Sequence, residues 1–78
     1  MDHQPIDSSA IASAGYDDDR GALEVKFRSG RVYLYKQVPR GVYEELITSS
    51  SAGRYLNEAI RANYEVELIY DPHRPRVL

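Results

Sequence analysis

The chain has 78 residues and a net charge of −2, so we expect one small domain that does not bind nucleic acids through an overall positive charge. Because it contains no cysteine, disulfides, thiolate zinc sites and a cysteine nucleophile are excluded, and a reducing compartment such as the cytoplasm is expected. No apolar run is long enough to cross a bilayer and the first residues lack the pattern of a secretory signal, so no membrane partner is expected.

The first part of the chain carries weak signals. Residues 1–7 form a polar lead, which we expect to be flexible, and His3 within it is interpreted as solvent-exposed. Residues 9–16 place Ile11 among small residues and run into a turn rich in Gly and Asp, which indicates a short first strand.

The clearest pattern is a hairpin. Apolar and polar residues alternate over residues 23–28, which predicts a half-buried strand. Residues 31–38 continue as its partner beyond a turn at Ser29 and Gly30. Pro39 then closes the hairpin, because proline restricts the residue before it to extended geometry and suits the first turn of a helix.

Two helices and a last extended segment follow. From Arg40 the apolar residues fall on one stripe, which predicts a short helix. The run 49–51 of three serines interrupts it and is expected to supply the cap hydroxyls of a second helix. The apolar stripe of that helix comprises Tyr55, Leu56, Ala59, Ile60 and Asn63 or Tyr64. Alternation over residues 66–70 predicts a last strand or an extended edge segment.

These elements predict an α+β fold, in which a small antiparallel meander of three to four strands is followed by two short helices packed on one face. A single domain is expected over residues 8–70. Residues 71–78 form a tail that we expect to be flexible, because its two prolines discourage regular structure. His73 in this tail is also interpreted as exposed.

The ordered set of small motifs resembles the KTSC domain, a family found at the C-terminus of some lysyl-tRNA synthetases and as a small stand-alone bacterial protein. The resemblance covers roughly residues 8–64. The residues that carry it are Ser8, Ser9, Gly15, Tyr16, Leu23, Val25, Phe27, Ser29, Gly30, Tyr33, Tyr35, Val38, Pro39, Val42, Tyr43, Ser51, Gly53, Tyr55, Asn57, Ile60 and Arg61. Because the family occurs together with a tRNA enzyme, the resemblance implies an RNA-binding role. It implies no catalytic residue.

The segment around the hairpin is locally basic, since it contains five cations and no acid. These residues are Lys26, Arg28, Arg31, Lys36 and Arg40. Acids collect elsewhere along the chain, so the charge is unevenly distributed even though the sum is small.

The register of the hairpin decides the role of Tyr33 and Tyr35. A two-residue loop would place both tyrosines on the outer face beside Lys26, where they could stack on bases. A three-residue loop with Gly30 in the left-handed conformation would pair Val25 with Tyr33 and turn both tyrosines into the core. Ser-Gly suits the two-residue loop less well than Asn-Gly, which favours the second register. The basic side chains are expected to point outward in either case.

Two further clusters have both a functional and a structural interpretation. Residues 49–54 could bind an anion at a helix N-terminus through backbone N–H groups and Arg54, although a serine cap with a glycine at a helix contact is favoured. Residues 17–19 are three consecutive aspartates, but they lack the ligand spacing of a calcium loop and are interpreted as a solvated turn. No metal site or cofactor is expected.

The sequence therefore favours a non-enzymatic binding module for RNA or another nucleic acid, because no acid, base or nucleophile has catalytic spacing. The expected phosphate contacts are Lys26, Arg28, Arg31, Lys36, Arg40 and Arg54, with Tyr33 and Tyr35 as possible stacking residues. The alternative is a module that binds a protein partner or a second copy of itself, through the open sheet face or an edge strand.

Overall fold

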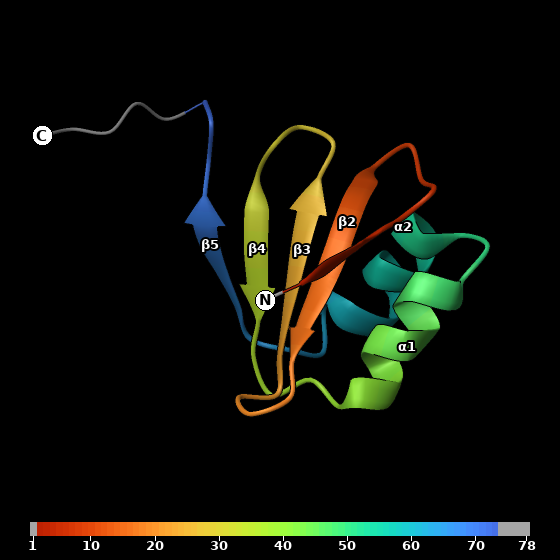
Figure 1. Cartoon of the computed structure of the whole chain (residues 1–78), viewed down its shortest axis with the longest axis vertical. Helices are drawn as coiled ribbons and strands as arrows, with labels where there is room; N and C mark the ends of the chain where they lie inside the picture. Colours follow the sequence, from red (N-terminus) through yellow and green to blue (C-terminus); the bar gives the residue numbers. More distant parts are fainter. Residues whose placement is uncertain (1, 74–78) are drawn as a thin grey trace, which may run out of the picture.

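A five-stranded antiparallel sheet in chain order, β1-β2-β3-β4-β5, forms the centre of the molecule, and the helices lie between β4 and β5 in the sequence. Figure 1 shows the computed structural model, in which residues 2–73 are described. The strands are β1 (His3–Pro5), β2 (Ile11–Asp17), β3 (Ala22–Phe27), β4 (Val32–Tyr35) and β5 (Val66–Tyr70). The helices are α1 (Arg40–Thr48), α2 (Ala52–Tyr55) and the π-helical η1 (Leu56–Ile60), which continues α2. The α+β class is confirmed, with five strands rather than three or four.

The additional strand is β1, which lies within the lead that the sequence analysis treated as irregular. It pairs antiparallel with β2, with His3 opposite Gly15. Ile6, directly after it, is 6% exposed and belongs to the core. The expectations of an irregular lead and of an exposed His3 are therefore wrong. The polar composition hid the strand, because an edge strand needs backbone pairing and few buried side chains.

The imidazole of His3 lies between two side chains of the sheet. Its Nδ1 is 2.7 Å from the hydroxyl of Ser13, and its Nε2 is 2.7 Å from a carboxylate oxygen of Glu24. These contacts join β1 to β2 and β3 on the side of the sheet away from the core.

The β3–β4 hairpin has the three-residue register. The N–H of Phe27 donates to the carbonyl of Arg31 at 2.9 Å, and Gly30 has a φ of +94°. Val25 consequently pairs with Tyr33, and Leu23 with Tyr35. The favoured register is confirmed, and both tyrosines lie on the side of the sheet that faces the helices.

The two helical segments cover one part of this face. Tyr43 and Leu46 of α1, together with Leu56 and Ile60 of the second helix, are buried, as the apolar stripes predicted. Figure 1 shows both helices beside β2, while β4 and β5 extend beyond them. The helical face of β4 is therefore only partly covered, and this is where a pocket opens.

The serine run separates the helices as expected, but it does not cap the second one. Ser51 precedes α2 without a side-chain cap hydrogen bond, and the hydroxyl of Ser49 instead accepts from the N–H of Ser51 at 3.1 Å. A Cβ added to Gly53 would lie 3.7 Å from Ala10 and from Ser8, so this glycine faces the loop before β2 and not the other helix. The capping expectation is wrong, because Ser51 makes no side-chain cap bond and the hydroxyl of Ser49 bonds within the connection.

The last strand is confirmed as β5, and the chain beyond it contacts the hairpin. Asp71 pairs with Arg31 at 3.4 Å and accepts a hydrogen bond from the N–H of His73 at 2.9 Å. Pro72 lies so close to Gly30 that a Cβ on the glycine would be 2.8 Å from it. The rest of the predicted tail, residues 74–78, lies outside the described residues. Over residues 2–73, no helix has the length and apolar character needed to span a membrane.

Candidate functional site

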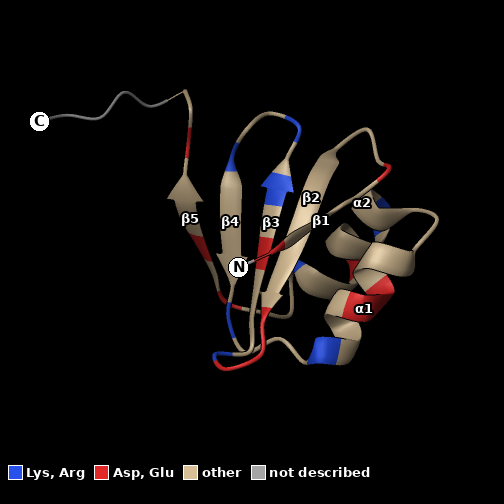
Figure 2. Cartoon of the chain, in the orientation of Figure 1, with Lys and Arg blue, Asp and Glu red and all other residues tan. Residues whose placement is uncertain are grey.

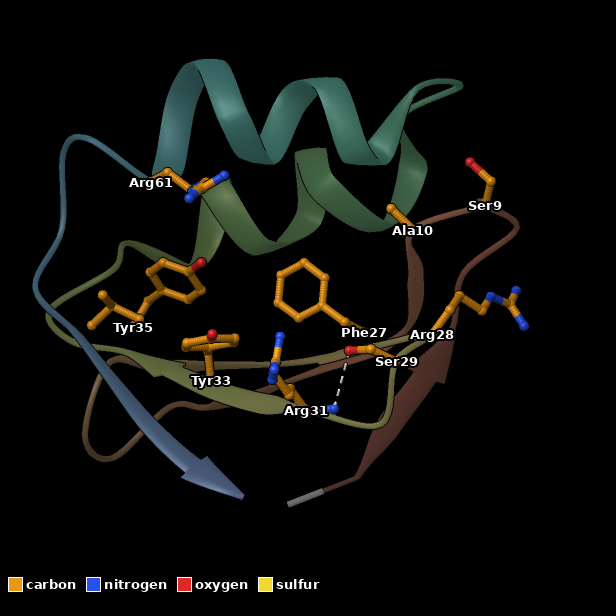
Figure 3. Close-up of a pocket in the computed structure, with 10 residues that line it drawn as sticks. Ser9, Ala10, Phe27, Arg28, Ser29, Arg31, Tyr33, Tyr35 and Arg61 are labelled. Atoms are coloured by element: carbon orange, nitrogen blue, oxygen red, sulfur yellow. Dashed lines mark hydrogen bonds between the residues drawn. The ribbon is translucent and has the colours of Figure 1, made fainter. Parts of the chain in front are cut away.

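A pocket of about 570 Å³ opens between the end of the second helix and the β3–β4 hairpin. Figure 3 shows it from the side, with side chains contributed from the sheet below and from the helix above. Its lining residues are Ser9, Ala10, Phe27, Arg28, Ser29, Arg31, Tyr33, Tyr35, Arg61 and Val66.

Aromatic rings form the floor of this pocket. Phe27 of β3 and Tyr33 of β4 lie on the same face of adjacent strands, with ring centroids 5.5 Å apart and planes at 89°. Both side chains are half-buried, so parts of their rings face the pocket. An accessible aromatic ring is a surface on which a nucleobase can stack.

Tyr35 lies deeper in the same pocket. It is only 3% exposed, and this burial raises the pKa of its hydroxyl, while the positive charge of Arg61 acts in the opposite direction. Figure 3 shows the Tyr35 ring next to Arg61, with its hydroxyl turned toward the helix end. Within residues 2–73, no protein group forms a hydrogen bond with this hydroxyl.

Three guanidinium groups surround the aromatic floor, and no carboxylate of residues 2–73 lines the pocket. Arg28 donates to the backbone carbonyls of Ser8 and Ile6 at 3.0 and 3.2 Å. Arg31 is paired with Asp71, whose pKa is lowered first by the backbone N–H of His73 and further by the charge of Arg31.

The third guanidinium is that of Arg61, which donates to the side-chain oxygen of Asn57 at 3.2 Å. No carboxylate pairs with Arg61 in the described part of the chain. Each guanidinium has five N–H donors, so all three arginines keep donors for a ligand. The pocket is therefore locally cationic on an acidic chain.

Half of the residues predicted for nucleic-acid contact line this pocket, and half lie elsewhere. Those in the pocket are Arg28, Arg31, Tyr33 and Tyr35. The prediction that every basic side chain points outward is wrong for Arg31, because the bulged turn pairs it with Phe27 on the helical side.

Two predicted lysines are outside the pocket. Lys26 is exposed on the opposite side of β3, as expected from the burial of its neighbour Val25. Lys36 lies between Glu67 at 3.3 Å and Glu65 at 3.9 Å. Figure 2 shows the acidic positions on and beside β5 next to the basic positions at the two ends of β4.

The remaining two arginines are also ion-paired. Arg40 contacts Asp18 at 2.7 Å, and this hydrogen bond is the main reason that the pKa of Arg40 is raised. Its guanidinium also lies 5.8 Å from the ring centroid of Tyr16, within cation–π range. Arg54 contacts Glu58 at 2.9 Å, one helical turn away. These charges are partly neutralised by their partners.

Arg61 was not predicted as a site residue, because the sequence analysis assumed regular α-helical spacing throughout the second helix. The N–H of Arg61 donates to the carbonyl of Leu56, five residues earlier, at 2.9 Å. Such a π-type turn shifts every following residue around the helix axis, and π-turns are frequent at functional sites. Phe27 was also missed, because its place in the apolar alternation indicated only a core residue.

The other two clusters lack the character of a ligand site. The hollow beside residues 50–54 is lined by Asp7 as well as by Arg54, which already contacts Glu58. In the aspartate run, a carboxylate oxygen of Asp17 accepts from the N–H of Asp19 at 3.0 Å, which holds the turn. The described residues contain no group of three His, Asp or Glu side chains that could hold a metal ion.

The chain is similar to several known proteins. A protein from Tsukamurella paurometabola is 39% identical over 61 residues, which span 78% of this chain and 91% of that protein. A lysine–tRNA ligase from Nostoc punctiforme is 33% identical over 61 residues, which make up 11% of the ligase. The crystal structure of a KTSC domain protein from Yersinia pestis matches with a TM-score of 0.84 at 33% identity, over 88% of this chain and 97% of that chain.

A family model also matches most of the chain. The model described as the KTSC domain matches residues 7–64, which contain β2 to β4, both helical segments and most of the pocket. Among the pocket residues only Val66 of β5 lies outside this range. The chain therefore belongs to the KTSC domain family.

Proposed function

We propose that this chain is a non-enzymatic module that binds nucleic acid, most favourably RNA, through the pocket between the β3–β4 hairpin and Arg61. One observation carries the proposal: in the described part of the chain, three arginines and no acid line a pocket with an aromatic floor, although the whole chain has a net charge of −2. Guanidinium groups bind phosphates and aromatic rings stack on bases, so one pocket offers partners for both the phosphate and the base of a nucleotide.

The relatives support RNA over DNA. A segment similar to this chain is part of proteins named lysine–tRNA ligase, and tRNA is an RNA. A cytoplasmic location is part of the proposal, because the chain contains no cysteine and shares this similarity.

The proposed interface is smaller than the basic stretch of the sequence. Lys36, Arg40 and Arg54 each contact a carboxylate of the same chain, which weakens their field at a distance. Arg28 and Arg61 contact no carboxylate within residues 2–73 and are therefore the main phosphate contacts, while the charge of Arg31 is partly neutralised by Asp71. Tyr33 and Phe27 provide the stacking surface.

Fluorescence anisotropy with a labelled single-stranded RNA of about ten nucleotides, measured over a series of salt concentrations, tests this function. We expect the logarithm of the binding constant to fall linearly with the logarithm of the salt concentration. Arg61→Ala should weaken binding and reduce the steepness of that slope by about one. Arg54→Ala removes the same charge from an exposed, ion-paired position, so it serves as the matched control and should leave affinity nearly unchanged. The absence of binding at low salt contradicts the proposal, as does an equal loss in both variants.

We also propose a second function, self-association along β5, because the two edges of the sheet differ. β1 has three residues and ends in Pro5, features that protect an edge against pairing. β5 has five residues with no proline or lysine, and Val66, Leu68, Ile69 and Tyr70 on it are 36% to 54% exposed.

A second copy suits this edge because the acids beside it are already paired within each chain. Glu65 and Glu67 contact Lys36, and Asp71 contacts Arg31, so two β5 strands could approach with reduced repulsion.

Sedimentation velocity over a wide concentration range should show a monomer–dimer equilibrium in the wild type. Ile69→Lys should shift it to monomer, whereas Gln4→Lys on the opposite edge should not. A monomer at every concentration contradicts self-association.

A further inference from the structure

We propose that the pocket holds one unpaired base of an RNA strand and that the Tyr35 hydroxyl bonds the polar edge of that base. This inference rests on the proposed function and specifies its ligand. The starting point is Tyr35, a residue 3% exposed that lines the pocket and whose hydroxyl has no hydrogen-bond partner within residues 2–73.

The hydroxyl is not needed for packing. The ring of Tyr35 fills its place between β4 and the helix end, and phenylalanine would fill the same volume. Within residues 2–73 no fully buried side-chain nitrogen or oxygen lacks a hydrogen-bond partner, so the unbonded oxygen of Tyr35 keeps some exposure. A hydroxyl that is instead turned into an open pocket next to a guanidinium is placed to bond a ligand.

The size of the pocket selects the kind of ligand. A volume of about 570 Å³ lies in the range of small-molecule sites, so the pocket can take a single nucleotide. The paired bases of an RNA duplex cannot reach it, because their faces are stacked and the major groove of the A-form helix is deep and narrow. An unpaired base can leave its neighbours and stack on Tyr33 and Phe27.

The polar groups above the floor match a nucleotide that carries such a base. Arg61 uses one donor on Asn57 at 3.2 Å and keeps its other N–H groups for the phosphate attached to the base. The Tyr35 hydroxyl can either donate to the base edge or accept from it. Ring nitrogens and carbonyl oxygens of bases accept hydrogen bonds from such groups. Arg28, at the outer end of the pocket in Figure 3, is then left for a neighbouring phosphate.

The test compares two strands and three proteins by anisotropy at low salt. One probe is a single-stranded RNA of about ten nucleotides, and the other is a strand of the same length with an abasic ribose at every position. Wild type is compared with Tyr35→Phe and with Tyr64→Phe, which removes a hydroxyl outside the pocket. Thermal unfolding of each variant verifies that it is folded.

We expect the base-bearing strand to bind at least about tenfold more tightly than the abasic strand, since each stacked base adds affinity. Tyr35→Phe should lose about fivefold on the base-bearing strand and nothing on the abasic strand. Tyr64→Phe should bind both strands as the wild type does.

The possible failures are distinguishable. Equal affinity for the two strands overturns the base pocket while nucleic-acid binding stands, and unchanged affinity of Tyr35→Phe overturns the role of the hydroxyl. The absence of binding to either strand refutes the function itself. Nucleoside monophosphates that displace the strand as effectively as unlabelled RNA would assign the pocket to free nucleotides and overturn its assignment to a strand.

Discussion

Gln37 adopts a φ of +54°, in the left-handed region, where the chain passes from β4 to α1. Its neighbours are fixed by backbone hydrogen bonds of 2.8 Å, from Lys36 to Glu65 and from Val38 to Gly21, so the conformation is imposed on it. The left-handed conformation costs a residue with a Cβ about 1–2 kcal/mol, and glycine avoids this cost. Glycine also has more conformational entropy in the unfolded state, which cancels part of the gain in stability. We expect Gln37→Gly to raise the free energy of unfolding by about 0.5–1 kcal/mol in urea denaturation. Gln37→Ala keeps the Cβ and should show no gain; an equal gain in both variants contradicts the explanation.

At the scale of elements, the β3–β4 turn determines which residues reach the pocket. Gly30 has a φ of +94°, and an added Cβ would lie 2.8 Å from the Cγ of Pro72. Gly30→Ala should therefore lower the free energy of unfolding by about 1–2 kcal/mol. Gly41 in α1 is the control, because a Cβ there meets no atom within 4 Å, and Gly41→Ala should stabilise the protein by about 0.5–1 kcal/mol. A Gly30→Ala variant as stable as the wild type would show that the turn does not need a left-handed residue.

The sequence predicted the elements whose signal is local and missed those that depend on distant partners. Alternation gave β3, β4 and β5, and helical spacing gave α1 and the buried stripe of the second helix. The turn chemistry of Ser29 and Gly30 even favoured the correct register. β1 could not be predicted, because its polar residues are held by pairing with β2. Arg61 could not be placed, because a π-turn is not visible in the apolar spacing.

Across the folded chain, several cations that lie close together in the sequence are paired with acids from other segments. Lys36 contacts Glu67 of β5 and Glu65 just before it, about thirty residues further along the chain, and Arg40 contacts Asp18 from the turn after β2. Isolated surface pairs of this kind add little stability, but they reduce the positive field of the basic stretch. Arg28 and Arg61, which line the pocket and contact no carboxylate within residues 2–73, are the cations that remain for an anionic ligand.

The most direct test of RNA binding in this pocket is a titration followed by nuclear magnetic resonance. A single-stranded RNA of about ten nucleotides is added to the isotopically labelled protein at low salt, and the shifts of the backbone amide and arginine side-chain signals are mapped on the structure. We expect the largest shifts at Phe27, Tyr33, Tyr35 and Arg61, with little change at Lys26 on the opposite side of the sheet. Shifts confined to the Lys26 side, or no shifts at all, would contradict RNA binding in the pocket.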